Sequence, residues 1–294
     1  MGVLLAAAVG LTAASAEAYC RTHTCQADGS CVLDEHLCPV GGRPLFWPRA
    51  CISFSVQEDG SKLRAITAAD AESVLDTAYS TWTDAKCADG VGPSIDVLKF
   101  DRVSCDQVEF NECDDNANIW VFRDEEWPYD DGGLTLAQTW VHFDTRNGEI
   151  FDADVEVNTA DFEITTADSA RRSQFIAIAT HEIGHVLGLD HSPDWEATMY
   201  ASYSRTSNIS ELTEDDVAGL CAIYPPDRKV GRCDPAPYNG FSTTCGTVDC
   251  DDGGCRATAP GYTRRGLTGL ALAGVALALM RLRRDRNRRR VDRL

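Results

Sequence analysis

Twelve residues decide the fold and the chemistry of this chain: Thr180-His181-Glu182-Ile183-Gly184-His185-Val186-Leu187-Gly188-Leu189-Asp190-His191. On a helix, His181 and His185 project from the same face one turn apart, so both rings can reach one ion. Gly188 can adopt a positive φ that other residues resist, so the helix can end there and the chain can bring His191 round as a third ligand. The spacing predicts a metal held by three neutral nitrogens, with one coordination position open.

Zinc suits these ligands, because it prefers histidine nitrogen at about 2.0–2.1 Å and four-coordinate geometry. Water in the open position has its pKa lowered to about 7, so Glu182 can remove its proton for attack on a peptide carbonyl. We therefore predict Glu182 as the catalytic general base. The predicted zinc ligands are His181, His185 and His191. Two histidines flanking a glutamate can also be an ordinary helix face without a metal, but the placing of Gly188 argues against that interpretation.

Apolar periodicity around the motif predicts an α+β (α/β-like) domain. Thr67 opens an amphipathic helix that runs to about Ala85, and Asp168 is a suitable N-cap for the helix that carries the motif. A third helix is indicated from Thr213, with acidic residues in its first turn, until Pro225 stops it. Strand-like runs, of which the last two form a hairpin, lie at 51–56, 95–100, 119–122, 134–143 and 149–157.

Thirteen cysteines indicate a protein that folds outside the reducing cytosol and uses disulfides. The odd number leaves at least one thiol free, paired with another chain or lost with a processed segment. Two clusters, each a small module that disulfides could hold, flank the main domain; zinc binding by the first, with His23 and His36, is the weaker alternative. The clusters are Cys20, Cys25, Cys31 and Cys38, and Cys233, Cys245, Cys250 and Cys255.

The composition divides the chain into five parts. Residues 1–18 are an apolar signal peptide with small residues at its end, and 19–42 are a cysteine-rich N-terminal module. The catalytic domain covers 43–226, and a cysteine-rich spacer covers 227–262. Residues 263–294 hold a short apolar helix and an arginine-rich end. The apolar run spans only about 22 Å, short of the roughly 30 Å hydrocarbon core, so a permanent membrane span is not expected.

The charge of the chain argues against nucleic acid as a partner. Its formal net charge is -19, whereas phosphate binding depends on clustered Lys and Arg. The strongly basic stretch, Arg281–Arg293, lies at the C-terminal end, outside the main domain. An acidic body of this kind suits solubility and calcium binding.

The motif resembles that of the metzincin metallopeptidases, in which His-Glu-x-x-His-x-x-Gly-x-x-His precedes a Met-turn, here Thr198-Met199-Tyr200. Within this group the chain is most similar to matrixins, in the run 185–192 and in the closing helix 212–220. The resemblance covers about 43–226. It implies a metzincin catalytic domain with a twisted, mostly parallel sheet, an antiparallel edge strand and about three helices, and it places Met199 as a hydrophobic floor under the metal.

The same resemblance suggests how substrate would bind. The run 133–139 is similar to the matrixin edge strand, which takes a polypeptide as an additional antiparallel strand. Gln138 and Ile150 stand where the family strands carry histidines of a second, structural zinc site, so a second zinc is not expected. His142 is expected to be structural.

Calcium binding and latency are two further expectations of this resemblance. Asp152, Asp154 and Glu156 alternate along a strand similar to the family's calcium-binding segment, although the same pattern is that of a solvated face. The loop 124–131 is the other candidate region. Many matrixins carry a long propeptide with a cysteine that blocks the zinc; no matching switch motif is visible here, and an N-terminal cysteine capping the metal is a hypothesis.

These inferences lead to one predicted function and one alternative. We predict an exported zinc-dependent endopeptidase that hydrolyses extended polypeptides. The alternative is a surface adhesion or binding protein that keeps a zinc-stabilised metzincin scaffold without turnover; the intact Glu182 argues against it. The C-terminal tail resembles the sorting tails of bacterial surface proteins, particularly those of myxobacteria, so membrane association is either transient or through a simple tail anchor. The sequence does not specify an oligomeric state.

Overall fold

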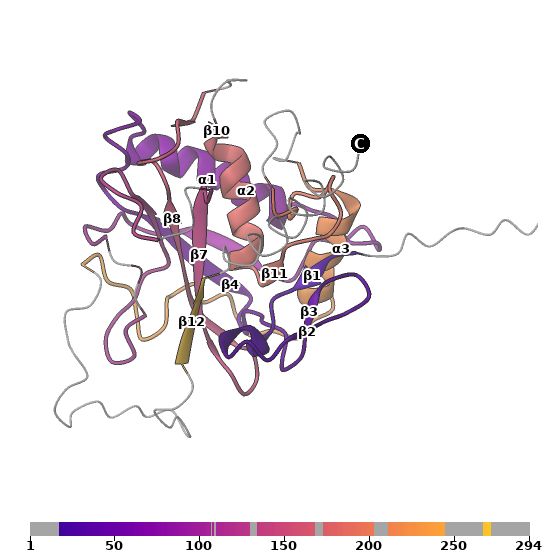
Figure 1. Ribbon diagram of the computed structural model, residues 1–294. Coiled ribbons are helices and arrows are strands. Elements are labelled where there is room, and N and C mark those ends of the chain that lie inside the picture. The colour runs from indigo at the N-terminus through magenta and orange to yellow at the C-terminus, as the bar shows by residue number, and fades with distance from the viewer. Residues whose placement is uncertain are drawn as a thin grey trace, which may run out of the picture.

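The computed structural model describes most of the predicted catalytic domain and parts of the two segments that flank it (Figure 1). The described residues are 18–106, 108, 110–129, 134–167, 173–202, 211–244 and 267–271. Residues 1–17 of the predicted signal peptide and most of the C-terminal tail therefore lie outside the described residues.

A mixed sheet carries the domain (Figure 1). Four neighbouring strands run parallel and a fifth lies antiparallel beside them, in agreement with the mostly parallel sheet that the resemblance implies. A short sixth strand, Leu267–Ala271, pairs with part of the outer side of the fifth. The central strands are buried along their whole length, because both faces of a parallel sheet are covered. In spatial order these strands are β5 (Asp96–Lys99), β4 (Cys51–Val56), β6 (Ile119–Phe122), β8 (Ile150–Val157) and β7 (Ala137–Asp144).

Three helices accompany the sheet: α1 (Ala68–Thr83), α2 (Phe175–Val186) and α3 (Glu214–Ile223). Thr67 and Thr213 cap α1 and α3 through reciprocal capping boxes, as their sequences predict. The predicted start of α2 is wrong, because its N-cap is Gln174 rather than Asp168, which lies outside the described residues. Gln174 makes no side-chain cap bond, so the start of α2 depends on packing and carries no local signal in the sequence.

The shorter elements are concentrated around the N-terminal module and the motif. Two of them, β1 and β11, pair antiparallel and join these two regions. They are β1 (Cys20–Arg21), the 3-10 helix η1 (Thr24–Ala27), β2 (Val32–Leu33), β3 (Pro39–Val40), β9 (Ile164–Thr165), β10 (Ser173–Gln174), β11 (Leu189–Asp190) and β12 (Leu267–Ala271).

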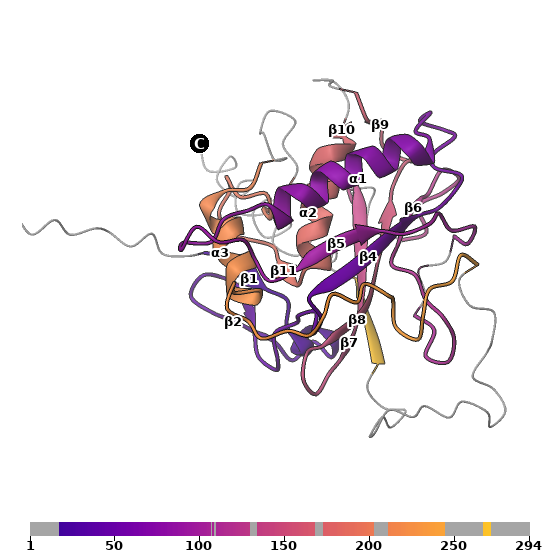
Figure 2. The same cartoon turned by 180° about the vertical axis from the view of Figure 1, so that it is seen from behind.

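The main core lies between the sheet and the helices α1 and α2, which cover one of its faces (Figure 2). Trp82 of α1 is fully buried there, and its indole nitrogen donates to the Thr180 carbonyl of α2 at 2.9 Å. Phe175 packs against Phe122 and Trp120 from the sheet, with ring centroids 5.3 and 6.1 Å apart. The motif helix is therefore fixed between α1 and the sheet.

The opposite face of the sheet is covered by the described residues of 101–106, 108 and 110–117 and by the segment 234–244. Phe241 packs on a small apolar cluster around Ile119, and the Asn116 amide donates to the Gly240 carbonyl at 3.0 Å. This differs from the expected self-contained spacer: Cys233 is bonded to Cys51, at the start of β4. The described part of the spacer is thus covalently joined to the main domain, a long-range pairing that cysteine spacing does not reveal.

All ten cysteines among the described residues form disulfides. The N-terminal module holds Cys20–Cys38 and Cys25–Cys31, and Cys87–Cys221 ties the segment after α1 to α3. Cys105 and Cys113 are also disulfide-bonded. The remaining three, Cys245, Cys250 and Cys255, lie outside the described residues, so the fate of the odd cysteine stays open.

The C-terminal apolar segment differs from the expected helix where the structure describes it. Leu267–Ala271 forms β12, which pairs antiparallel with Trp140–Asp144 of β7. An edge strand presents a row of unpaired N–H and C=O groups, and these can take a further strand. Within the described residues, no helix has both the length and the apolar character that a membrane crossing requires.

The packing of α2 predicts that Gly184→Ala destabilises the protein. A Cβ at Gly184 would overlap the Met199 sulfur and lie 3.1 Å from the Trp82 ring. In a helix alanine is normally favoured over glycine by about 0.5–1 kcal/mol, but overpacking costs about 1–3 kcal/mol, so we expect a net loss of stability. Denaturant unfolding measures it, with Gly92→Ala as control, because atoms near Gly92 stand 3.7 Å or more from its added Cβ. Equal stability of Gly184→Ala and the parent would contradict this packing.

Candidate metal centre

Helix α2 and the turn that follows bring the three predicted ligands together. Gly188 has a φ of +95°, and a Cβ there would stand 2.8 Å from the Leu45 carbonyl, so only glycine fits this turn. One ring nitrogen from each of His181, His185 and His191 lies within 4.8 Å of the other two. The Nε2 atoms of His185 and His191 are 3.2 Å apart. The predicted convergence of three imidazoles is therefore present.

The hydrogen bonds of the histidines leave the correct nitrogens free for a metal. His181 donates from Nδ1 to the Thr198 carbonyl at 2.7 Å, and His185 from Nδ1 to the Leu189 carbonyl at 2.9 Å. Each Nε2 therefore keeps its lone pair and faces the cluster. Two nitrogens bound to one tetrahedral zinc at about 2.0–2.1 Å stand roughly 3.3 Å apart, close to the separation found here. The residues present fit zinc.

Burial keeps His185 and His191 neutral. Desolvation, reinforced by the neighbouring imidazoles, lowers the pKa of His185 well below its usual range. Burial likewise lowers the pKa of His191 to about 3, with His181 adding to the effect. Neutral imidazoles are the form that binds a metal, so no proton has to be displaced from these two rings near neutral pH.

Glu182 lies beside the histidines and is held by the edge strand. Its carboxylate accepts a hydrogen bond of 2.6 Å from the Thr139 hydroxyl of β7, and both side chains are buried. Burial raises the pKa of Glu182, while a charge on His181 and the Thr139 hydroxyl act in the opposite direction. Sequence reasoning missed Thr139: it lies within the predicted edge strand, but spacing alone does not show that its hydroxyl reaches the motif helix.

The floor of the site is the loop that contains Met199. The Met199 side chain is buried against Gly184, the residue that lies between His181 and His185 in the sequence of α2. The first turn of α3 holds this loop, because the Asp216 carboxylate accepts from the Thr198 and Met199 amides at 2.9 and 3.0 Å. Asp216 therefore does more than cap its own helix: it also sets the position of the Thr198 carbonyl that orients His181.

Comparison with known proteins agrees with this geometry. The family model described as Matrixin, a peptidase family, matches residues 46–225 of the chain. The chain belongs to the matrixin family. Matrixins bind a catalytic zinc ion, and the histidine triad is the place where this chain can hold it. The matched region is accordingly the matrixin domain of the chain, and it contains the histidine triad.

Individual relatives carry names of the same class. The chain is 28% identical to metalloendoproteinase 1-MMP of Arabidopsis thaliana over 218 residues, which are 72% of this chain and 53% of that protein. It is 30% identical to matrix metalloproteinase-18 of Xenopus laevis over 191 residues, 61% of this chain and 36% of that protein. It is 31% identical to interstitial collagenase of Equus caballus over 165 residues, 54% and 29% respectively. The matches thus span about half or less of these relatives.

The structure contradicts the hypothesis that an N-terminal cysteine caps the zinc and keeps the enzyme latent. The four cysteines of the N-terminal module are paired with one another in disulfides, so none offers a thiolate to the metal. The hypothesis of an N-terminal cysteine capping the zinc is therefore wrong in this state of the protein, and so is the alternative of a zinc site in the module. Oxidation consumes the ligands on which both depended.

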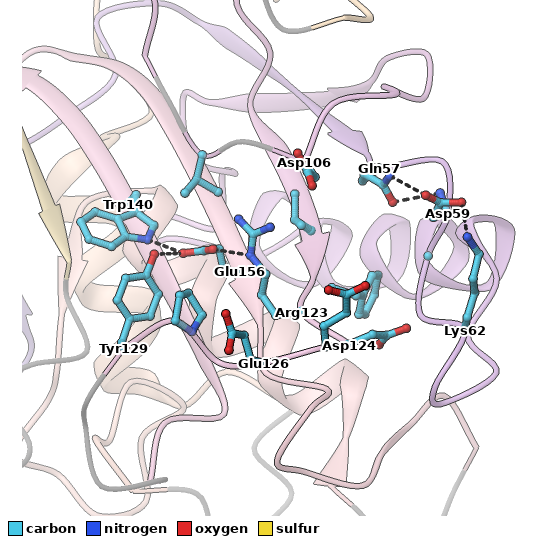
Figure 3. Close-up of a pocket in the computed structure, with 16 residues that line it drawn as sticks. Gln57, Asp59, Lys62, Asp106, Arg123, Asp124, Glu126, Tyr129, Trp140 and Glu156 are labelled. Atoms are coloured by element: carbon cyan, nitrogen blue, oxygen red, sulfur yellow. Dashed lines mark hydrogen bonds and ion pairs between the residues drawn. The ribbon is translucent and has the colours of Figure 1, made fainter.

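The expected calcium ligand Glu156 is occupied by protein donors. Its carboxylate accepts from Arg123 at 2.5 Å, from the Trp140 indole at 2.7 Å and from the Tyr129 hydroxyl (Figure 3). These groups line a pocket of about 770 Å³ whose lining residues include none of the three histidines. Asp124, in the second candidate region, also lines it and accepts from Ser61, Leu63 and Thr159.

Asp152 and Asp154 are different, because they are fully buried with free oxygens. Asp154 accepts from the Ile119 amide at 2.8 Å through one oxygen only, and Asp152 stands 3.4 Å from His142 across the hairpin. Burial raises the pKa of both, and the charge of Asp152 raises that of Asp154 further. Calcium binding stays a prediction, and Asp152 and Asp154 are the candidate ligands whose oxygens remain free for the ion. His142 stacks on Phe110 with centroids 5.6 Å apart, in agreement with a structural role.

We predict that Asp152→Asn raises stability at neutral pH. The pKa of Asp152 is higher in the folded than in the unfolded chain, so the folded state binds the proton more tightly. The bound proton therefore stabilises the fold at low pH, and this stabilisation is lost as pH rises from about 4 through the raised pKa. Asparagine removes one ionisable group and can donate to Asp154. Thermal unfolding between about pH 4 and 8 in a chelator should show a shallower pH dependence for the variant.

The same series with calcium in place of the chelator tests the calcium prediction. A calcium-dependent rise in the melting temperature of the parent, absent from Asp152→Asn, assigns the ion to this pair. A variant that is less stable than the parent near pH 7 in the chelator, with an unchanged pH slope, would contradict the buried carboxyl pair.

Proposed function

We propose that this chain is an exported zinc-dependent endopeptidase that hydrolyses peptide bonds of extended polypeptides. In this proposal His181, His185 and His191 hold the zinc, and Glu182 is the general base. The observation that carries it is the convergence of three histidine ring nitrogens within 4.8 Å beside a buried carboxylate. Three nitrogens leave one position of a tetrahedral ion for water or substrate, which distinguishes a catalytic from a closed structural site.

The chemistry divides between the ion and the side chains. Zinc, when bound, polarises the peptide carbonyl and acidifies water. Glu182 accepts a proton from the attacking water and later delivers it to the leaving amine. Its burial favours this exchange, because the raised pKa brings the carboxyl closer to the working pH. The Thr139 hydroxyl holds one carboxylate oxygen, so the other is oriented for proton transfer.

The first part of β7 supports an extended polypeptide as the substrate. β7 is the antiparallel strand next to β8, only its second half is paired with the outermost strand β12, and its Thr139 side chain reaches the catalytic glutamate. Among the strands that the structure describes, the register of β12 covers Trp140–Asp144 and leaves Ala137–Thr139 unpaired on the outer edge. A substrate strand added there gains main-chain hydrogen bonds beside Glu182, whatever its side chains.

Export is supported by the disulfides. Ten bonded cysteines among the described residues need an oxidising compartment. The proposal therefore keeps residues 1–18 as a signal peptide and 263–294 as a sorting or anchoring tail, as the sequence indicates. The adhesion alternative is not favoured, because a non-catalytic scaffold has no need of a buried carboxylate beside the open metal position, and the relatives are named as proteinases.

We predict that Glu182→Gln abolishes hydrolysis while zinc stays bound. The amide keeps the shape of the side chain but cannot accept a proton, and loss of general-base catalysis costs about 10²–10⁴-fold in rate. Cleavage of a labelled unfolded protein gives the rate, and metal analysis gives the zinc content. Glu196→Gln, an exposed carboxylate after the third ligand, is the matched control. Zinc in both proteins with cleavage by neither parent nor variant would favour the adhesion alternative.

We predict that Thr139→Val lowers kcat about tenfold or more with little change in KM. Valine keeps the shape of threonine but removes the hydroxyl, and a hydrogen bond to a charged group contributes roughly 1.5–3 kcal/mol. Thr139→Ser restores the donor, so its kcat should return close to that of the parent. Steady-state kinetics on one peptide substrate separate the two parameters. Equal kcat for the valine and serine variants would rule out this role of the hydroxyl.

A further inference from the structure

The N-terminal module, residues 19–42, lies outside the region matched to the matrixin family, yet it contacts the zinc motif directly. Its strand β1 pairs antiparallel with β11, so that Cys20 stands opposite Asp190 and Arg21 opposite Leu189. The Thr22 amide also donates to the Gly188 carbonyl at 3.0 Å. The module is therefore hydrogen-bonded to the turn that connects the second and third ligands.

Thr22 reaches the second ligand through one carbonyl. Its hydroxyl donates to the Leu189 carbonyl at 3.0 Å, and the same carbonyl accepts from Nδ1 of His185 at 2.9 Å. Thr22 is fully buried, so water does not replace its hydroxyl easily. Held from two sides, this carbonyl fixes the orientation of the His185 ring and keeps its proton on Nδ1.

Gln26 reaches the third ligand through one carboxylate. Its amide nitrogen donates to one oxygen of Asp190 at 2.7 Å, and the other oxygen of Asp190 accepts from the His191 amide at 2.7 Å. The amide oxygen of Gln26 in turn accepts from the His23 amide at 3.1 Å, so both ends of the side chain are used. The backbone of His191 is thus linked to η1 of the module.

Covalent bonds make the module stiff enough to hold these contacts. Cys20–Cys38 and Cys25–Cys31 bracket Thr22 and Gln26, and the Thr24 amide donates to the Arg43 carbonyl at 2.8 Å. An isolated pair of two-residue strands is marginally stable at best, whereas disulfides remove much of the entropy that such a segment would otherwise regain. The contacts to the motif are therefore preorganised.

We propose that the N-terminal module is an integral part of the metal centre, in which Thr22 and Gln26 act as positioning residues that set the affinity for zinc. The inference rests on the metal assignment of the proposed function and is independent of hydrolysis. Partners that orient metal-binding histidines typically contribute 10–100-fold to metal affinity. The module therefore acts in assembling the site and supplies no ligand of its own, since its four cysteines are in disulfides.

Zinc affinity of the full chain tests this proposal. We expect Thr22→Val, which removes only the hydroxyl, and Gln26→Met, which removes only the amide, each to weaken zinc binding 10–100-fold in competition with a chromophoric chelator. Thr22→Ser should bind zinc like the parent. Glu35→Gln, an exposed residue of the same module, is the second control.

The outcomes separate the inference from the proposed function. Zinc dissociation constants of Thr22→Val and Gln26→Met within twofold of the parent overturn the inference, even if the enzyme cleaves peptides. Weaker binding in these two variants with normal binding in both controls supports it, even if no cleavage is found. Near-ultraviolet circular dichroism of the metal-free chains confirms folding. If Thr22→Val does not fold, the comparison uses Gln26→Met alone, because Gln26 is half-exposed and its substitution disturbs the fold less.

Discussion

The structure depends on the convergence of three imidazoles at one point beside a buried carboxylate. This arrangement is costly to build, because polar rings leave water and each needs a partner for its second nitrogen. Backbone carbonyls provide two of those partners, Thr198 for His181 and Leu189 for His185. Both carbonyls belong to turns, so the elements that position the turns also determine the site. Asp216 of α3 holds the first turn, and Gly188 shapes the second.

Much of this arrangement could be predicted from local sequence. The spacing of histidines and glycine predicted the convergence of the triad, because four residues on a helix and one left-handed turn determine nearly all of the geometry. Period-two and period-3.6 patterns also predicted the strands, the helix after Thr67 and the hairpin of β7 and β8. The start of α2 could not be predicted, since Gln174 offers no cap and tertiary packing sets the boundary.

The contacts missed by sequence reasoning all join segments far apart in the chain. Thr139 is 43 residues from Glu182, and Cys51 is 182 residues from Cys233. Spacing carries no information about such pairs when no helix or hairpin relates them. The carboxylates of β8 illustrate the same limit: their alternation is visible in the sequence, but the neutralisation of Glu156 by Arg123 depends on the neighbouring strand. The sequence shows the chemical type of each side chain, whereas the fold determines which residues that side chain contacts.

The central claim is that one zinc ion is bound by three histidines with a light atom in the fourth position. X-ray absorption at the zinc edge, on the full chain loaded with one equivalent of zinc, tests it most directly. The account predicts three nitrogens and one oxygen at about 2.0–2.1 Å, with one nitrogen fewer in His191→Ala. Sulfur at about 2.3 Å, or a spectrum unchanged by His191→Ala, would contradict it.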